Sequence, residues 1–280
     1  MSNKILVPID FSDNAHTAIQ FAIDLAKKRE FEIHLYHNYT VSSSSFEDES
    51  KESTDENFKA DILMSDLIDK LKANNPTVTF TSKCERGIIT ESLFKETKNA
   101  DYSAIIMGTK GKTDDTSVIV GSTTYAVSQK SNIPVIAIPV HYQTKDIHKI
   151  GLLSNFKYAE LDTLNEFIKI FGSNVKVQII HVHYHPDSEA DIEDKLEIWK
   201  YQIKKHTEIT DVDIEVDSIQ TDVEELDTIP EVINEIIKDE QIDLVLITKT
   251  RKSFFERLFK KSVAKQIIHH PIIPTFFSKA

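Results

Sequence analysis

The chain has 280 residues, of which 40% are hydrophobic and 28% are charged, and its formal net charge is −12 at pH 7. That length is enough for two domains of ordinary size, and the acidic balance argues against general binding to nucleic acid or to an anionic membrane. No apolar run approaches the length of a membrane span. The single cysteine, Cys84, excludes an intrachain disulfide, and the first residues lack the apolar stretch of a secretory leader, so we expect a cytoplasmic protein.

Apolar runs with strand character alternate with helical patterns through the first half of the chain. Strands are predicted at 5–9, 31–36, 77–85, 103–107 and 134–138, and helices at 13–29, 57–73, 90–99 and 122–130. The segment 41–54, rich in Ser, Glu and Asp, is predicted to be a loop, a solvated insertion rather than a phosphorylated switch. Buried strands that alternate with helices favour parallel pairing through right-handed crossovers, so the predicted fold class is α/β with a doubly wound parallel sheet.

The second half of the chain repeats the plan of the first half. Residues 149–156, 177–182, 243–248 and 273–274 match residues 4–11, 33–38, 103–108 and 133–134, respectively. A repeat of about half the chain predicts two tandem domains, 1–141 and 147–280, rather than a solenoid. The segment that joins them is too short to let the halves drift far apart.

Glycine is concentrated in one loop of the first half. The chain contains only six glycines, and Gly108, Gly111 and Gly121 all lie between a predicted strand and a predicted helix. Glycine permits positive φ and a close approach of the backbone, and the free N–H groups at a helix start suit a phosphate group. The spacing, Gly-x2-Gly-x9-Gly-Ser, therefore predicts a phosphate-binding loop that ends at Ser122.

This spacing resembles the glycine loop of the universal stress protein family, whose ATP-binding members carry Gly-x2-Gly-x9-Gly-(Ser/Thr). The repeat extends the resemblance over nearly the whole chain, as two copies. The resemblance implies Rossmann-like domains of the adenine nucleotide alpha hydrolase type, in which the loop wraps the ribose and phosphates of ATP. Ser122 and Thr123 would then face the phosphates, cap the helix, or do both.

The resemblance also implies two contacts outside the glycine loop. Asp10, at the end of the first predicted strand, corresponds to the aspartate that accepts hydrogen bonds from the adenine–ribose portion, although the same residue type also forms turns. Asn38 corresponds to the residue whose backbone meets adenine. The family usually has valine there, so a backbone contact is compatible with Asn38, whereas a side-chain contact is not.

The second half lacks these features. By alignment, the three glycines and the aspartate are replaced and only the hydroxyl is kept: the residues are Thr248, Arg251, Lys261, Asn155 and Ser262. Side chains then stand where the backbone would have to touch ribose and phosphate, so we predict that nucleotide is not bound in the second half. The basic segment 249–265 suits another anion or an acidic partner, but charge runs usually form a solvated face.

Nothing in the sequence resembles a catalytic base poised over a γ-phosphate, so no catalytic residue is predicted and any turnover should be slow. His181, His183 and His185 alternate along a predicted strand end but lack a nearby carboxylate or cysteine, so no metal site is predicted. The leading hypothesis is a stress-response regulator or sensor, not an enzyme, that binds ATP with Mg²⁺. AMP or another adenine nucleotide is the alternative ligand.

Two other hypotheses stay open at this point. The chain could be a scaffold for an unknown protein partner that binds no nucleotide, or an enzyme of a related fold such as an adenylate-forming one, although we find no catalytic signature for the latter. Family members commonly pair through their last strand, so the resemblance implies an intrachain pseudo-dimer, and a further homodimer stays open. Neither nucleic acid nor membrane is expected as a partner.

Overall fold

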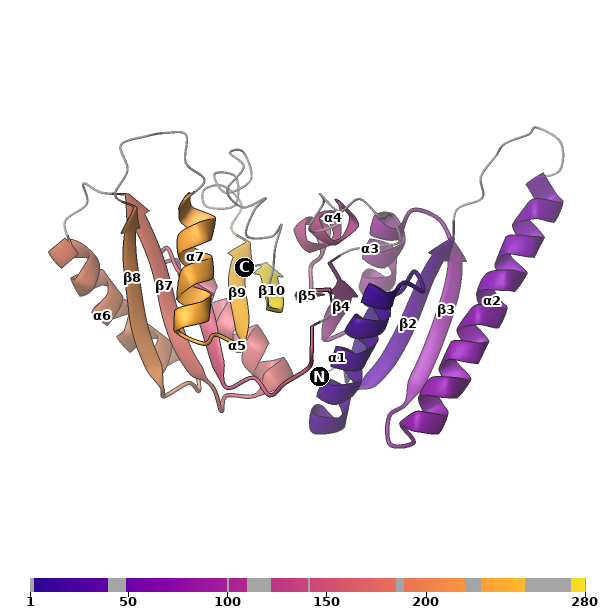
Figure 1. The fold of residues 1–280 in the computed structure, drawn as a ribbon, viewed down its shortest axis with the longest axis horizontal. Coiled ribbons are helices and arrows are strands. Elements are labelled where there is room, and N and C mark those ends of the chain that lie inside the picture. The colour runs from indigo at the N-terminus through magenta and orange to yellow at the C-terminus, as the bar shows by residue number, and fades with distance from the viewer. Residues whose placement is uncertain are drawn as a thin grey trace. The chain divides into compact units, whose positions relative to one another are not determined.

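The computed structural model of the chain describes residues 3–39, 49–99, 101–109, 122–140, 142–184, 189–219, 228–249 and 273–279. The chain forms two compact units that divide between Thr144 and Lys145. Each unit is an α/β domain with a parallel sheet, labelled in Figure 1. Among the helices of the described ranges, none is both long and apolar enough to cross a membrane.

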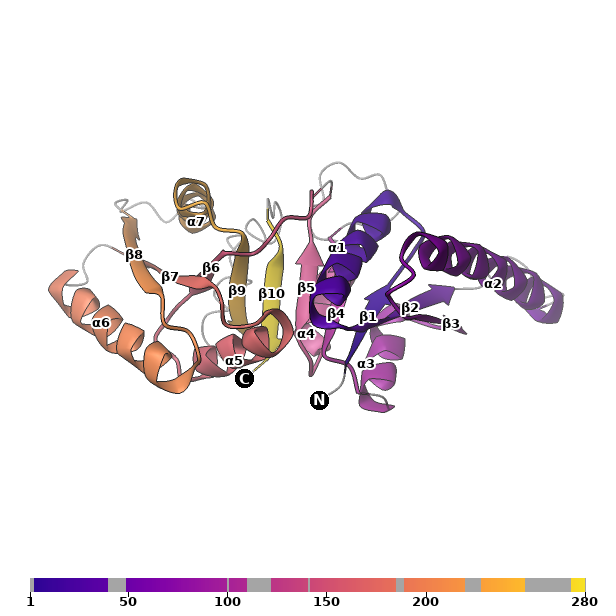
Figure 2. The same cartoon turned by 90° about the horizontal axis from the view of Figure 1, so that it is seen from below.

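The first unit has a five-stranded parallel sheet in the order β3-β2-β1-β4-β5. Its elements are β1 (Lys4–Pro8), α1 (Asp13–Arg29), β2 (Glu32–Tyr39), α2 (Glu49–Asn74), β3 (Phe80–Arg86), α3 (Ile89–Asn99), β4 (Ala104–Gly108), α4 (Ser122–Lys130) and β5 (Val135–Ile138). Figure 2 shows α1 and α2 on one face of this sheet and α3 and α4 on the other. Because β2 and β4 flank β1 on opposite sides, the strand order reverses there, and ligands of such sheets bind at the carboxyl ends near that point.

The second unit repeats this order strand by strand, as β10-β9-β6-β7-β8, again with parallel pairing. Its described elements are β6 (Lys149–Leu153), α5 (Ala159–Phe171), β7 (Lys176–Tyr184), α6 (Glu189–His206), β8 (Val212–Ile219), α7 (Thr228–Asp239), β9 (Leu244–Lys249) and β10 (Thr275–Lys279). In Figure 2, α5 and α6 cover one face and α7 the other. The predicted fold class, two tandem doubly wound domains, is confirmed, whereas the exact bounds 1–141 and 147–280 stay a prediction.

The central strands are apolar at successive residues because helices cover both faces of each sheet. Ile5, Leu6 and Val7 of β1 are fully buried, and every residue of β9 is buried. Continuous burial of this kind is typical of parallel sheets, in contrast to the alternating pattern of a sheet with one solvated face. The apolar residues of α1 form the stripe that packs on β1 and β4, and Ser12 caps the start of this helix.

Two elements are longer than the sequence predicted. β2 continues past residue 36 to Tyr39, because β3 pairs with it as far as Tyr39 and Arg86. α2 begins at Glu49, inside the segment predicted as a loop. Residues 49–74 contain neither glycine nor proline and are rich in Glu and Lys, which favour helix, so the polar composition of the segment did not exclude helical structure.

Candidate functional site

Asp10 lies in the turn between β1 and α1, at the carboxyl end of β1. Its Oδ1 accepts hydrogen bonds from the main-chain N–H of Ser12, at 3.0 Å, and from the Ser12 hydroxyl, at 2.5 Å. The Ser12 Oγ in turn accepts a hydrogen bond from the N–H of Ala15, at 3.2 Å, and so caps α1. Asp10 therefore acts as a turn former, one of the two roles that the sequence allowed, and it fixes the first turn of the helix.

Gly108 is the last residue of β4 and lies against the start of α1. A Cβ atom at this position would lie 2.6 Å from Cγ of Asn14, closer than Cβ atoms approach other groups, and 3.0 Å from the Asn14 carbonyl oxygen, which is a tight contact. Asn14 is buried in the first turn of α1. Glycine at position 108 is thus required for helix–strand packing, a role that the sequence analysis did not foresee.

α4 also begins against Gly108. The hydroxyl of Thr124, a buried residue, donates a hydrogen bond of 2.7 Å to the carbonyl oxygen of Gly108. Ser122 is the first residue of α4 and Thr123 is exposed in its first turn, as predicted for the end of the glycine loop. The starts of α1 and α4 therefore meet at the same strand end. Gly111 and Gly121 lie outside the described residues.

Asn38 lies within β2, one residue before its end, rather than after the strand as the sequence analysis placed it. Its Nδ2 donates hydrogen bonds to the carbonyl oxygen of Glu85, at 3.2 Å, and to the hydroxyl of Ser92, at 2.9 Å. These bonds join β2, β3 and α3, so the side chain already has a structural role.

The main-chain groups of Asn38 face the side of β2 on which β1 lies. The N–H of Ile9 donates to the carbonyl oxygen of Tyr36, and the register between β1 and β2 ends at Pro8 and Tyr36. In a parallel strand the main-chain groups of alternate residues face the same neighbour, so those of Asn38 point past the end of β1. The main-chain contact at Asn38 that the resemblance implies stays a prediction.

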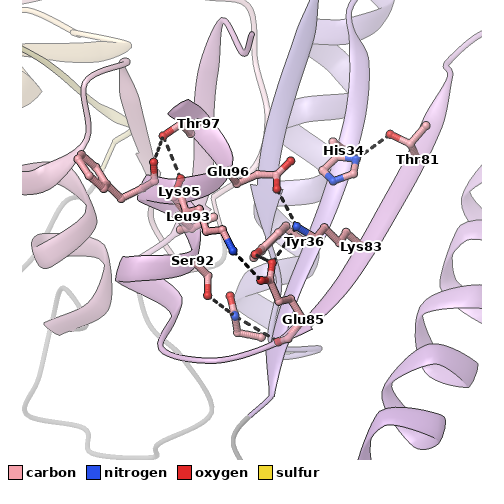
Figure 3. Close-up of polar contacts among 12 residues, drawn as sticks. His34, Tyr36, Thr81, Lys83, Glu85, Ser92, Leu93, Lys95, Glu96 and Thr97 are labelled. Carbon is pink, nitrogen blue, oxygen red and sulfur yellow. Dashed lines mark hydrogen bonds and ion pairs between the residues drawn. The ribbon is translucent and has the colours of Figure 1, made fainter. Parts of the chain in front are cut away.

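A charged network on the α3 side of the sheet was not predicted from the sequence. Lys83 forms ion pairs with Glu85, at 2.8 Å, and with Glu96 of α3, at 2.9 Å. The hydroxyl of Tyr36 donates to Glu85 (Figure 3), and that of Tyr102 donates to Glu96. The hydrogen bonds from Lys83 and Tyr36 lower the pKa of Glu85. The spacing of Lys83 and Glu85, two residues apart on β3, was the available signal for this network, which holds α3 against the sheet beside Asn38.

In the second unit a buried carboxylate fills the turn after β6. Glu160, in the first turn of α5, is 3% exposed. Its Oε2 accepts a hydrogen bond from the Ser154 hydroxyl at 2.6 Å, and its Oε1 accepts from the N–H groups of Asn155, at 2.8 Å, and Lys157, at 3.1 Å. Burial raises the pKa of Glu160, although these hydrogen bonds oppose the shift. Ala15 holds the aligned position in the first unit, whose turn after β1 contains the carboxylate of Asp10 instead.

The end of β9 is likewise filled by side chains. Thr248, which aligns with Gly108, is buried, and its hydroxyl donates to the hydroxyl of Thr163 at 2.8 Å. Ala159 holds the position that aligns with Asn14. The two units have therefore exchanged the large and small partners of this helix–strand contact. The other second-half loop positions, Arg251, Lys261 and Ser262, lie outside the described residues.

Within the described ranges, no group of three or more His, Cys, Asp and Glu side chains is placed to hold a metal ion. The Nδ1 atom of His181, on β7, lies 2.9 Å from the carbonyl oxygen of Ser154, so this ring contacts the turn after β6. His185 lies outside the described residues.

Comparison with known proteins places this fold and this loop in one family. The model of the Universal stress protein family matches residues 1–139 and 168–278. Universal stress protein YxiE of Bacillus subtilis is 25% identical over 154 residues, which are 49% of this chain and 99% of the relative. A universal stress protein of Methanocaldococcus jannaschii is 30% identical over 142 residues, which are 48% of this chain and 81% of the relative.

A solved structure resembles the whole chain. The crystal structure of a universal stress protein from Archaeoglobus fulgidus covers 100% of this chain and 97% of its own, with a TM-score of 0.72 and 17% identity, which is a likeness of fold. In the second half the family match begins only at residue 168, after the turn that Glu160 fills. With a family match in each half, the chain belongs to the universal stress protein family in its tandem form.

Proposed function

We propose that this protein is a stress-response regulator that binds an adenine nucleotide, ATP in the first instance, in its first half only. The observation that carries the proposal is that α1 and α4 both begin against Gly108, at the carboxyl edge where the strand order reverses. Two helix starts at one point present main-chain N–H groups and the positive ends of two helix dipoles to the same space. That arrangement suits a phosphate chain.

The strength expected of such a site is sufficient for a cellular nucleotide. An anion at one helix start gains about 0.3–1 kcal/mol from the dipole, and each hydrogen bond to a charged group adds about 1.5–3 kcal/mol. A few such bonds together with burial of the base reach about −8 kcal/mol, which corresponds to micromolar affinity. Mg²⁺ would accompany the triphosphate as its counter-ion.

The base and ribose would lie beside the end of β2. The main-chain groups of Asn38 point past the end of β1, where they can pair with the edge of a purine. Asp10 lies in the turn just after the adjacent strand β1, so we place its carboxylate near the ribose of a base held in that way. Both residues belong to turns and strands that the fold fixes without the ligand.

The second half gives the contrast that supports a single site. Glu160 takes three hydrogen bonds in the turn after β6, and Thr248 places a buried side chain at the position that aligns with Gly108. A nucleotide there would meet the Glu160 carboxylate, and a threonine in place of the glycine. We assign a regulator rather than an enzyme because nothing in the sequence resembles a base poised over a γ-phosphate.

The test is calorimetric titration with ATP, with and without Mg²⁺, and with AMP and cyclic AMP. We expect about one nucleotide per chain at micromolar affinity. Gly121→Asp should abolish binding, because it sets a side chain and a negative charge against the phosphates. Lys261→Asp, the aligned change in the second half, is the matched control and should bind as the wild type does.

Two other outcomes of the titration would contradict the proposal. Two nucleotides per chain would refute the restriction to the first half. Absence of binding for all three nucleotides, with a folded protein by circular dichroism, would refute the nucleotide-binding function and favour the scaffold hypothesis.

A further inference from the structure

The main chain just before Asp10 is held at both of its polar groups by β2. The N–H of Ile9 donates a hydrogen bond of 2.8 Å to the carbonyl oxygen of Tyr36. The carbonyl oxygen of Ile9 lies 2.8 Å from Nδ1 of His37. Because a carbonyl oxygen can only accept, Nδ1 of His37 carries the hydrogen in this contact. Neighbouring residues of β2 thus clamp the peptide that leads into Asp10.

The residue after Asp10 is held by the same histidine. Phe11 adopts a left-handed backbone conformation, with φ of 59°, which is unusual for a residue with a large side chain. Its ring packs against the His37 ring, with centroids 4.7 Å apart and an interplanar angle of 53°. The aromatic contact offsets part of the cost of this conformation. His37 therefore contacts the residue on each side of Asp10.

The second half contains the same arrangement, with nearly equal distances. Phe156 has φ of 59°, and its ring lies 4.7 Å from that of His181. The Nδ1 atom of His181 lies 2.9 Å from the carbonyl oxygen of Ser154. The N–H of Ser154 donates a hydrogen bond of 2.9 Å to the carbonyl oxygen of Ile180. The residue enclosed by this second clamp is Asn155. The clamp is thus a property of the turn, and the residue that it encloses differs between the halves.

We infer that His37 is a positioning residue for the nucleotide, acting through Asp10. It touches no part of the ligand in this scheme. Its N–H fixes the carbonyl of Ile9 and its ring fixes Phe11, so the main chain on both sides of Asp10 is set, while Ser12 holds Oδ1 of the carboxylate, before the nucleotide arrives. Preorganisation of this kind raises affinity because the cost of ordering the group is met during folding. The inference rests on the proposed function of the first half.

Two substitutions of His37 distinguish the effect of its hydrogen-bond donor from the effect of its ring volume. His37→Leu keeps an apolar side chain of similar size but removes the hydrogen-bond donor to Ile9. His37→Asn keeps an N–H donor near the position of Nδ1 but removes most of the ring. The aligned change His181→Leu is the matched control, because it breaks the same hydrogen bond in the half without the proposed site.

The experiment is calorimetric titration of these variants with Mg²⁺–ATP, at a temperature where circular dichroism shows each one to be fully folded. We expect His37→Leu to weaken ATP binding about tenfold, His37→Asn to restore much of the loss, and His181→Leu to leave the dissociation constant unchanged. Thermal midpoints without nucleotide should fall to a similar extent in His37→Leu and His181→Leu, because the two clamps are alike.

Wild-type affinity in His37→Leu would overturn the inference, and so would an equal loss of affinity in His181→Leu, which would indicate general loosening of the fold. Failure of His37→Asn to improve on His37→Leu would also count against the hydrogen bond as the cause. If the wild-type protein itself binds no nucleotide, the proposed function fails instead, so the two failures are distinguishable.

Discussion

His34 on β2 and Gln178 on β7 occupy aligned positions in the two halves. The Nδ1 atom of His34 lies 2.8 Å from the hydroxyl oxygen of Thr81. Its Nε2 is buried and has no hydrogen-bond partner within the described ranges. Burial and, after it, the charge of Lys4 lower the pKa of His34, so the folded protein keeps this ring neutral. A second proton on the ring would be a buried, unpaired charge.

This histidine should make the stability of the first half depend on pH. Because the pKa of folded His34 is lowered from 6.5, its full contribution to stability is present above about pH 6.5 and is lost as the pH falls through the folded value. Lys83 also lowers this pKa, whereas Glu96 raises it. His34→Gln, which installs the residue of the second half, should flatten the decline of the urea midpoint between about pH 7.5 and 5. Equal slopes in the variant and the wild type would contradict the prediction.

At the scale of elements, the contact of α1 with β4 depends on the missing side chain at Gly108. Gly108→Ala should destabilise the protein by about 1–3 kcal/mol, because the new methyl group meets Asn14, including its main-chain oxygen, and the helix must shift. Gly151→Ala is the control. Its methyl group would meet the end of the flexible Ile180 side chain, at 2.8 Å, so a smaller loss is expected. Urea denaturation followed by circular dichroism measures both, and the opposite ranking would refute the packing argument.

The carboxylate of Asp243, just before β9, is hydrogen-bonded to the main chain at the start of β6. Asp243 Oδ2 accepts hydrogen bonds of 2.9 Å from the N–H groups of His148 and Lys149, and its Oδ1 lies 2.6 Å from Nζ of Lys145. Burial alone would raise the pKa of Asp243, but the hydrogen bonds from Lys145 and the two N–H groups outweigh burial and lower the pKa. This contribution to stability is present above pH 3.8, and it is lost as the pH falls through the folded value.

Asp243→Asn should therefore destabilise the second unit at neutral pH by about 1–3 kcal/mol, because an amide cannot serve both N–H groups and the ammonium. Lys145→Ala should cost less, about 0–1 kcal/mol, since that side chain is 52% exposed. The single tryptophan of the chain, Trp199, lies buried in α6, so its fluorescence during urea denaturation reports on the second unit. A loss in Lys145→Ala as large as in Asp243→Asn would show that the ion pair, rather than the main-chain bonds, dominates.

At the scale of the whole molecule, the repeat made the fold predictable. The matches of residues 4–11 with 149–156 and of 33–38 with 177–182 placed equivalent strands in both halves, and the structure shows the same strand order in each unit. Apolar runs and helical periods depend on local sequence, so they fixed the order of elements. Their ends were less certain, as β2 and α2 show, because the end of a strand depends on its partner strand.

The details of the site were less accessible from the sequence. The spacing of the glycines singled out Gly108, but its contact with Asn14 involves an element far away in the chain. Glu160 gave no signal either, since a glutamate in the first turn of a helix is ordinary. Its burial and its three hydrogen bonds emerge only when the turn after β6 is folded around it. Tertiary contacts therefore decide what fills each turn, and the local sequence does not show them.

Glu160 makes the turn after β6 different from its counterpart in the first half. The second half holds a buried carboxylate among three donors of its own chain, whereas the first half has alanine at that position and carries its turn carboxylate on Asp10. Under the proposed function, added nucleotide would raise the melting temperature of the first half and leave that of the second half unchanged, so the second half would serve as an internal control within one polypeptide.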